Sequence, residues 1–156
     1  SFDHIVRVTG DDLFRCPNLI KLAIESHLKT NADYTFYDNS STGLESEIIS
    51  QRSLKYIATC AIDKNSTEYL SWYLDNDSLL NINPLSAPSF LTNEVLITLD
   101  TDADYKLIKL LAERVDSYRS STNALLEWWP LVASQLNYHL PSSQIQRFDI
   151  DTTTLI

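Results

Sequence analysis

Hydrophobic and polar positions along this chain switch between strand-like and helix-like spacing. The β-rich run His4 to Val8 starts almost at the first residue. Pro17 to Thr30 then carries apolar residues at helical spacing, behind a proline suited to a first helical turn. A short aromatic strand is predicted at Tyr34 to Tyr37 and another strand at Leu44 to Ile49. The first third of the chain therefore predicts strand, helix, strand, strand.

Later residues predict further helices and strands, separated by segments rich in turn-forming residues. In order, we expect a helix from Ser50 or Gln51, a helix at Thr67 to Leu74, a strand at Leu79 to Ile82, a strand at Glu94 to Leu99, a helix at Asp102 to Val115, a helix at Asn123 to Asn137 and a strand at Gln144 to Ile150. Thr101 and Asp104 stand three positions apart, as in a capping box.

Strands that alternate with helices predict an α/β sheet with helices on its faces. We place an α/β domain at residues 1–116 and a helical extension with a polar tail at 117–156. A Ser-rich segment opens that extension, and its apolar helix holds Trp128 and Trp129 and is interrupted by Pro130. In such sheets ligands gather at the carboxyl ends of strands, so acids that follow strands are the first residues to inspect.

Charge and composition restrict the classes of molecule that this chain can be expected to bind. The formal charge of −9 opposes binding to nucleic acid and to anionic membranes, and no apolar run approaches the ~20 residues that span a bilayer. We expect a soluble, cytoplasmic protein in which Cys16 and Cys60 are free thiols. A phosphorylated ligand would need a divalent cation to offset the repulsion. Because the chain contains no methionine and opens directly on a strand, we expect a fragment of a longer protein.

The first candidate site is the turn that follows the strand His4 to Val8. Gly10 is expected to let the backbone turn, which places Asp11 and Asp12 at the sheet edge. Their hard oxygen ligands suit Mg²⁺ bound to phosphate. Spacing alone favours the plainer alternative of a turn with a capping aspartate.

The second candidate is Asp100, at the end of the predicted strand Glu94 to Leu99. The alternating acids that begin here do not form a calcium loop, because Tyr105 and Leu111 occupy the positions that need glycine and glutamate. Asp102 and Asp104 are explained as acids at a helix N-terminus. Asp100 has no such structural role, so we favour it as a metal ligand.

Other polar residues give weaker signals. Glu45 and Glu47 lie two apart on a predicted strand and so share a face, either as a solvated edge or as ligand contacts. Histidines and cysteines form no zinc-like cluster, and no serine lies in a nucleophile elbow. Trp128 and Trp129 are more typical of a core or an interface than of a base-stacking surface.

A set of short motifs, in order and in register over about residues 2 to 115, resembles the cytidylyltransferases of the spore-coat polysaccharide and acylneuraminate type. These motifs are Ile5-Val6-Arg7-Val8-Thr9-Gly10-Asp11, Pro17-Asn18-Leu19-Ile20, His27, Asn31-Ala32-Asp33-Tyr34, Gly43-Leu44-Glu45-Ser46-Glu47, Leu99-Asp100-Thr101 and Asp104-Tyr105. The resemblance implies a three-layer fold of the nucleotide-diphospho-sugar transferase type, with a central sheet flanked by helices, which is expected to be incomplete in this chain.

The same resemblance implies an activity and a set of site residues. In that family a sugar oxygen attacks the α-phosphate of CTP, and a divalent cation, expected to be Mg²⁺, bridges the phosphates to two aspartates. By position those aspartates resemble Asp11 and Asp100. Arg7 and Asp11 would be the catalytic positions, and Glu45 and Glu47 would contact the sugar.

Two departures from the family pattern keep other functions open. The N-terminal loop of Arg, Ser, Arg and Lys that holds the triphosphate is absent, so we expect this chain alone to be inactive. Residues Ser66 to Tyr69 replace a run that often contains histidine. One alternative is a non-catalytic binding or assembly domain that uses the Trp128-Trp129 helix for a homo-oligomer or a partner domain. A further alternative is a metal-dependent glycosyltransferase that uses Asp11 and Asp12.

Overall fold

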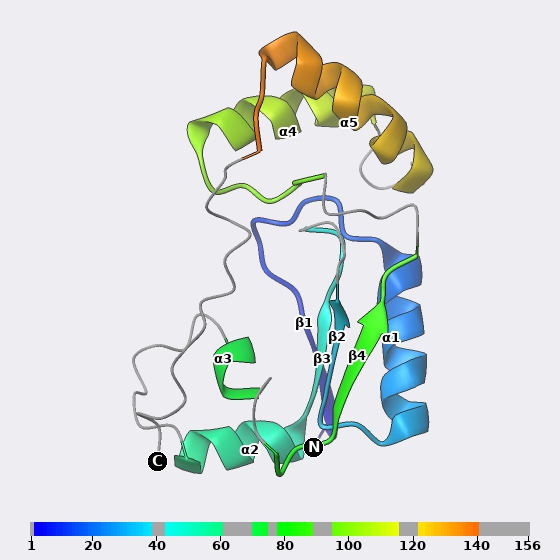
Figure 1. Ribbon diagram of the computed structural model, residues 1–156, viewed down its shortest axis with the longest axis vertical. Coiled ribbons are helices and arrows are strands. Elements are labelled where there is room, and N and C mark those ends of the chain that lie inside the picture. Colours follow the sequence, from blue (N-terminus) through cyan, green and yellow to red (C-terminus); the bar gives the residue numbers. More distant parts are fainter. Residues whose placement is uncertain are drawn as a thin grey trace.

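A mixed four-stranded sheet forms the centre of the computed structural model. The structure describes residues 2–38, 43–60, 70–74, 78–88, 95–115 and 122–140. The strands are β1 (His4–Arg7), β2 (Tyr34–Asp38), β3 (Glu47–Ser50) and β4 (Ile82–Ser86), in the order β1-β3-β2-β4 (Figure 1). β3 runs antiparallel to β1 and β2, whereas β2 and β4 are parallel.

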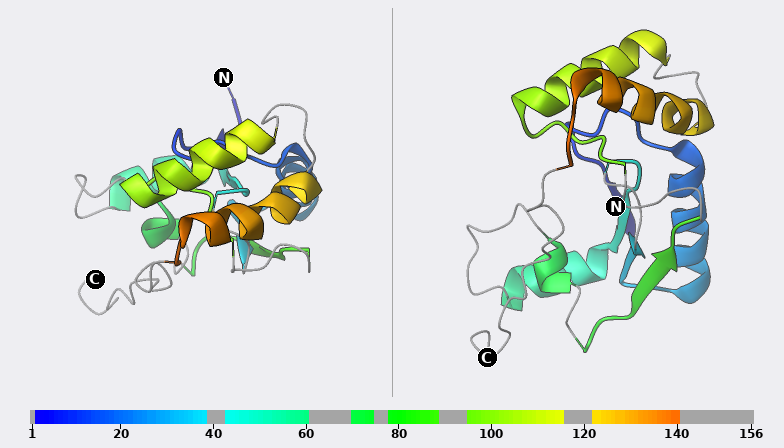
Figure 2. Two further views of the ribbon diagram at one scale, coloured as in Figure 1. Left: turned by 90° about the horizontal axis from the view of Figure 1, so that it is seen from above. Right: turned by 45° about the horizontal axis from the view of Figure 1, so that its top comes forward.

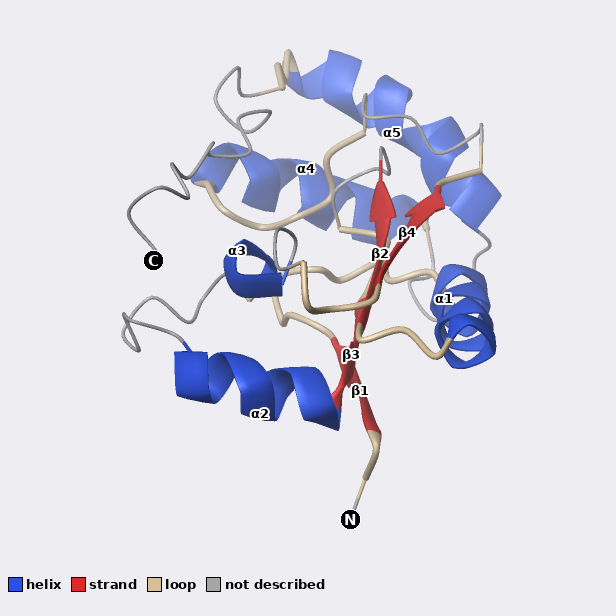
Figure 3. Ribbon diagram, turned by 60° about the horizontal axis from the view of Figure 1, so that its bottom comes forward, coloured by secondary structure: helices blue, strands red, loops and turns tan. Residues whose placement is uncertain are grey.

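Helices surround this sheet, which confirms the predicted α/β class (Figure 3). They are α1 (Pro17–Thr30), α2 (Gln51–Cys60), α3 (Ser71–Leu74), α4 (Asp102–Arg114) and α5 (Thr122–Leu136). α4 and α5 pack side by side across the end of the sheet to which β4 points, and α2 lies near the opposite end (Figures 1 and 2). None of the helices in the described ranges is long and apolar enough to cross a membrane.

Two hydrophobic cores lie on opposite sides of the sheet because successive strand residues point to opposite faces. Ile48 of β3 belongs to the core that includes Leu19 of α1 and residues of α4 and α5. Its neighbour Ile49 belongs to the other core, with Ile57 of α2 and Leu74 of α3. Each fully buried Ile or Leu side chain stabilises the folded state by about 1.5–3 kcal/mol relative to leaving that side chain exposed to water.

Polar residues define the helix ends that position the site. Thr101 and Asp104 form the predicted capping box at the start of α4. Asn31 follows α1 with φ 49° and Asn137 follows α5 with φ 51°, left-handed conformations that asparagine tolerates better than most residues. These turns direct Asp33 and Tyr138 toward the partners described below.

Several predicted elements differ in the structure, among them the strand expected at Leu44 to Ile49, which is β3 at Glu47–Ser50. The strand expected at Leu79 to Ile82 is instead β4, which contains Pro84; this is possible because β4 is an edge strand. No strand forms in residues 95–99, where an isolated bridge joins Thr98 to Asp12. α5 continues through Pro130, whose side chain is exposed.

Some predictions fall on residues outside the described ranges. These are the start of the helix predicted from Thr67, the strand predicted at Gln144 to Ile150 and the domain boundary at 116/117.

Candidate functional site

Three loops meet at the end of the sheet that α4 and α5 cover. The Cys16 N–H donates to the Leu44 carbonyl at 3.0 Å, joining the loop after β1 to the one before β3. The segment before α4 is bridged at Thr98 to Asp12, and the Leu99 N–H donates to the Asp11 carbonyl at 3.2 Å. The structure therefore brings the backbones of Asp11 and the Leu99-Asp100 segment together, although 89 positions separate Asp11 from Asp100 in the sequence.

Buried polar atoms without a hydrogen-bond partner gather in two of these loops. In the described part of the chain they are Asp11 Oδ1, Arg15 Nε and Ser46 Oγ. Buried polar groups in folded proteins nearly always have a partner, so each such atom calls for a water, an ion or a ligand. Asp11 therefore presents an unsatisfied carboxylate oxygen where the three loops converge.

Asp12, in contrast, is held by its own loop. Its Oδ2 accepts a hydrogen bond from Thr9 Oγ1 at 2.6 Å and forms an ion pair with Arg15 Nη2. The side chains of Arg15 and Asp12 are 16% and 10% exposed, so this pair is largely shielded from water. Asp12 fixes the turn, which leaves Asp11 as the acid of this loop with an unsatisfied oxygen.

Gly43, and not Gly10, is the glycine that this region requires. A Cβ at Gly10 would meet nothing within 4 Å and its φ is not left-handed, so the predicted need for glycine there is wrong. Gly43 has φ +103°, and a Cβ there would lie 2.9 Å from the Ile97 carbonyl carbon and 3.0 Å from Asp12 Oδ1. Only glycine lets these two loops approach so closely.

Asp100 is exposed and lies at the start of the α4 cap, whereas Asp104 is buried. The Asp104 Oδ2 atom accepts from the Asp100 N–H at 3.2 Å and from the Thr101 N–H at 2.7 Å. Asp102 and Asp104 are thus the first-turn acids of α4, as predicted. The Asp100 backbone is anchored while its carboxylate lies at the surface.

Arg7 and Glu47 form a cross-strand ion pair at the same end of the sheet. The two residues face each other in the β1–β3 register, and Arg7 Nη1 lies 2.6 Å from Glu47 Oε2. The other Glu47 oxygen, Oε1, accepts from the buried Tyr34 hydroxyl, a contact that sequence patterns did not indicate. Glu45 precedes β3, so the prediction that a strand sets Glu45 and Glu47 on one face is wrong.

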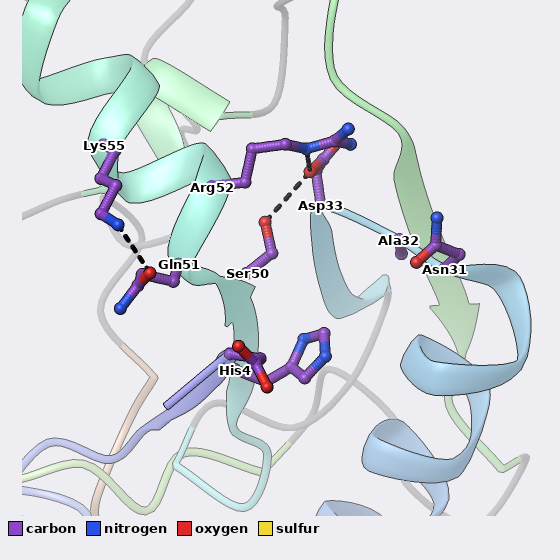
Figure 4. A pocket seen from close by; sticks show the side chains of 9 residues that line it. His4, Asn31, Ala32, Asp33, Ser50, Gln51, Arg52 and Lys55 are labelled. Carbon is purple, nitrogen blue, oxygen red and sulfur yellow. Dashed lines mark hydrogen bonds and ion pairs between the residues drawn. The ribbon is translucent and has the colours of Figure 1, made fainter. Parts of the chain in front are cut away.

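A cavity of about 490 Å³ lies at the opposite end of the sheet, where β1 and β2 begin (Figure 4). Asp33, Ser50 and Arg52 line it, and none of the candidate site residues does. Asp33 accepts from Ser50 Oγ at 3.0 Å and from Arg52 Nη2 at 2.5 Å. Burial alone would raise the pKa of Asp33, but the hydrogen bonds from Arg52, Asn81 and Ser50 together lower it. This network ties the sheet to α2, so we assign it a structural role.

Two histidines that lie far apart in the sequence, His4 and His27, are in contact in the structure. His4 Nδ1 lies 3.0 Å from the buried His27 Nε2, and His27 Nδ1 lies 2.9 Å from Thr35 Oγ1. Burial and the neighbouring His4 lower the pKa of His27, against an opposing effect of Asp33. Within the described ranges no group of three or more His, Cys, Asp or Glu side chains is placed to hold a metal ion.

Both tryptophans of α5 pack against the core next to α1 and α4. Trp129 Nε1 donates to the Leu96 carbonyl at 2.9 Å, and the Arg114 guanidinium lies 5.3 Å from the Trp128 ring centre. The core interpretation is therefore confirmed for both tryptophans, and an oligomer formed through this helix stays a prediction.

Comparison with solved structures identifies the fold as that of a cytidylyltransferase. A cytidylyltransferase from Leptospira borgpetersenii serovar Hardjo-bovis superposes with a TM-score of 0.72 at 18% identity, over 89% of this chain and 60% of that one. The predicted fold class is confirmed by this match.

Sequence comparison adds two relatives. The chain is 31% identical over 138 residues to the spore coat polysaccharide biosynthesis protein SpsF of Bacillus subtilis, covering 84% of this chain and 58% of SpsF. It is 34% identical over 118 residues to the uncharacterized protein MJ1063 of Methanocaldococcus jannaschii, covering 74% of this chain and 49% of that protein. No protein-family model matches. The chain therefore belongs to the cytidylyltransferase family of the spore-coat polysaccharide type, and it spans 58% and 49% of the lengths of these two relatives.

Proposed function

We propose that this chain supplies the cation-holding acids of a cytoplasmic sugar-nucleotide cytidylyltransferase, which transfers CMP from CTP to a sugar. The main support is the backbone contact between Leu99 and Asp11, which sets Asp11 next to the Asp100 segment. A separate observation is that Asp11 Oδ1 is buried without a hydrogen-bond partner. The similarity to SpsF, whose name refers to polysaccharide biosynthesis, favours a sugar destined for a cell-surface polysaccharide.

The residues present fit Mg²⁺. Proteins usually bind this cation through one or two carboxylates, with water and substrate phosphates as the remaining ligands. We propose that Asp11 and Asp100 provide such a pair of hard oxygen donors. When bound, Mg²⁺ would offset the phosphate charge and orient the α-phosphate.

Arg7 and the two glutamates are proposed for the sugar side of this site. Both Glu47 oxygens are engaged, by Arg7 Nη1 and by the Tyr34 hydroxyl. Glu47 is therefore suited to hold Arg7 in place and not to accept a proton in the reaction. We propose that Arg7 and Glu45 contact the substrate and that Glu47 fixes their surroundings.

A non-catalytic binding domain on the same fold is the second candidate. It is favoured by the internal pairing of Asp12 with Arg15 and of Glu47 with Arg7, which satisfies acids that an enzyme would otherwise present to ligand. Such a domain would keep the fold but would not release pyrophosphate.

Pyrophosphate release from CTP, Mg²⁺ and candidate sugars, measured on the complete protein that carries this chain, separates the two candidates. We expect Asp11→Ala and Asp100→Ala each to lower the rate by at least about a hundredfold, as for loss of a group that stabilises transition-state charge. The matched control is Asp102→Ala, at an exposed first-turn acid of α4. Unchanged release in the Asp11→Ala, Asp100→Ala double variant would contradict the proposal.

A further inference from the structure

The segment that follows α5 reaches back to the candidate site. α5 ends at Leu136, and Asn137 adopts φ 51°, which reverses the chain. The Tyr138 N–H then donates to the Ala133 carbonyl at 2.9 Å, the hydrogen bond of a Schellman-type helix end. The Tyr138 ring also packs edge-on against Trp129, with centroids 6.3 Å apart. Tyr138 is therefore fixed by the local structure of its own helix end.

The hydroxyl of Tyr138 lies on the buried acid that holds the start of α4. Tyr138 Oη donates to Asp104 Oδ1 at 2.6 Å, and the other oxygen of Asp104 accepts from the Asp100 N–H and the Thr101 N–H. Asp104 is 1% exposed, so water competes little for these bonds. Burial and the Asp104 carboxylate raise the pKa of Tyr138, and a tyrosine hydroxyl is in any case protonated, and so a donor, at neutral pH.

We infer that Tyr138 is a positioning residue for Asp100: its hydroxyl fixes the Asp104 carboxylate, which in turn fixes the backbone of the proposed cation ligand. The inference rests on the proposed function for the role of Asp100. It gives the α5 segment a part in the site, because mutation of a residue that orients a metal ligand typically lowers metal affinity by about 10- to 100-fold.

Tyr138→Phe removes the hydroxyl and keeps the ring that packs on Trp129. Tyr105→Phe is the matched control, since Tyr105 lies on α4 but its side chain is 56% exposed. Two quantities are measured by NMR on the 156-residue chain: the hydrogen exchange rate of the Asp100 and Thr101 amides, and the Mg²⁺ affinity from shifts of the same amides.

For Tyr138→Phe we expect the two amides to exchange about fivefold faster, as for loss of one net hydrogen bond. We expect Mg²⁺ to bind about tenfold more weakly, the lower end of the effect of outer-shell partners. Amides of α1 should be unaffected, which distinguishes local loss of positioning from global destabilisation. Tyr105→Phe should change neither quantity.

Unchanged exchange at Asp100 in Tyr138→Phe would overturn the inference, and so would faster exchange with unchanged Mg²⁺ affinity. Failure of the proposed function would appear separately, as unchanged pyrophosphate release in the Asp11→Ala, Asp100→Ala double variant of the complete protein. The positioning of the Asp100 backbone would then be decided by the exchange rates alone.

Discussion

Arg52 reaches from the surface of α2 to the buried Asp33 through two hydrogen bonds, Nε to Oδ1 at 2.9 Å and Nη2 to Oδ2 at 2.5 Å. The Arg52 side chain is 72% exposed and that of Asp33 only 2%. Asp33 also accepts from Ser50 Oγ and from the Asn81 N–H, so one carboxylate joins β2, β3, α2 and the start of β4.

Asp33 and Arg52 should therefore contribute unequally to the stability of the fold. Asp33→Ala removes the acceptor of the Asn81 N–H and of the Arg52 guanidinium at a buried position, and we expect a loss of about 3 kcal/mol. Arg52→Ala leaves Asp33 with its other donors, and because the guanidinium is mostly exposed to water the loss should be clearly smaller. Urea unfolding of both variants measures this, with Lys21→Ala in an exposed 3.9 Å pair as the control. Equal losses would contradict the assigned role of Asp33.

Protonation of His27 should destabilise the fold as the pH falls. The pKa of His27 is lowered in the folded chain, whereas an unfolded histidine titrates near 6.5. Below neutral pH the unfolded state therefore binds the proton first, and stability is lost as the pH falls through and below that value. The lowered pKa of Asp33 acts only at more acidic pH, below the ordinary range of an aspartate.

Thermal unfolding between pH 7.5 and 5.5 tests this for His27→Gln. As the pH falls, the unfolding temperature of the variant should decrease less than that of the wild type, because a glutamine gains no proton. His139→Gln, at an exposed histidine, should keep the wild-type slope. A wild-type midpoint that rises as the pH falls would show that the sign assigned to His27 is wrong.

Gly43 should tolerate no side chain, in contrast to Gly10. Gly43→Ala places a methyl group 2.9 Å from the Ile97 backbone in a left-handed conformation, and we expect a loss of about 2 kcal/mol. Gly10→Ala meets open space and should change stability by less than about 0.5 kcal/mol. Chemical denaturation compares the two. If Gly43→Ala were the milder change, the close approach of the two loops would be contradicted.

Much of the fold could be predicted from local patterns because local physics decides those elements. The boundaries of α1 follow from Pro17 and the apolar spacing behind it, and the cap of α4 follows from Thr101 and Asp104. The strand predicted at residues 94–99 shows the limit of this reasoning. β-branched and apolar residues indicate an extended segment, but pairing partners decide whether it joins a sheet, and here it bridges Asp12 instead.

The candidate site was predictable in part. Asp11 and Asp100 could be selected because each follows a predicted strand. Only Asp100 lacked a structural explanation in the sequence, whereas a plain turn with a capping aspartate was the favoured alternative for the loop of Asp11. The Tyr34 and Tyr138 hydroxyls could not, since their partners Glu47 and Asp104 are 13 and 34 positions away. Hydrogen bonds of this kind depend on tertiary packing, which periodicity does not encode.

Cation binding by the pair Asp11 and Asp100 is the central claim, and a double-mutant cycle tests it most directly. Mn²⁺ replaces Mg²⁺ as the probe, and free Mn²⁺ is measured by electron paramagnetic resonance for the wild type, Asp11→Ala, Asp100→Ala and the double variant. If both acids hold one ion, each single change should weaken binding at least about tenfold, and the double change should cost clearly less than the sum of the two. Wild-type affinity in either single variant would contradict the account.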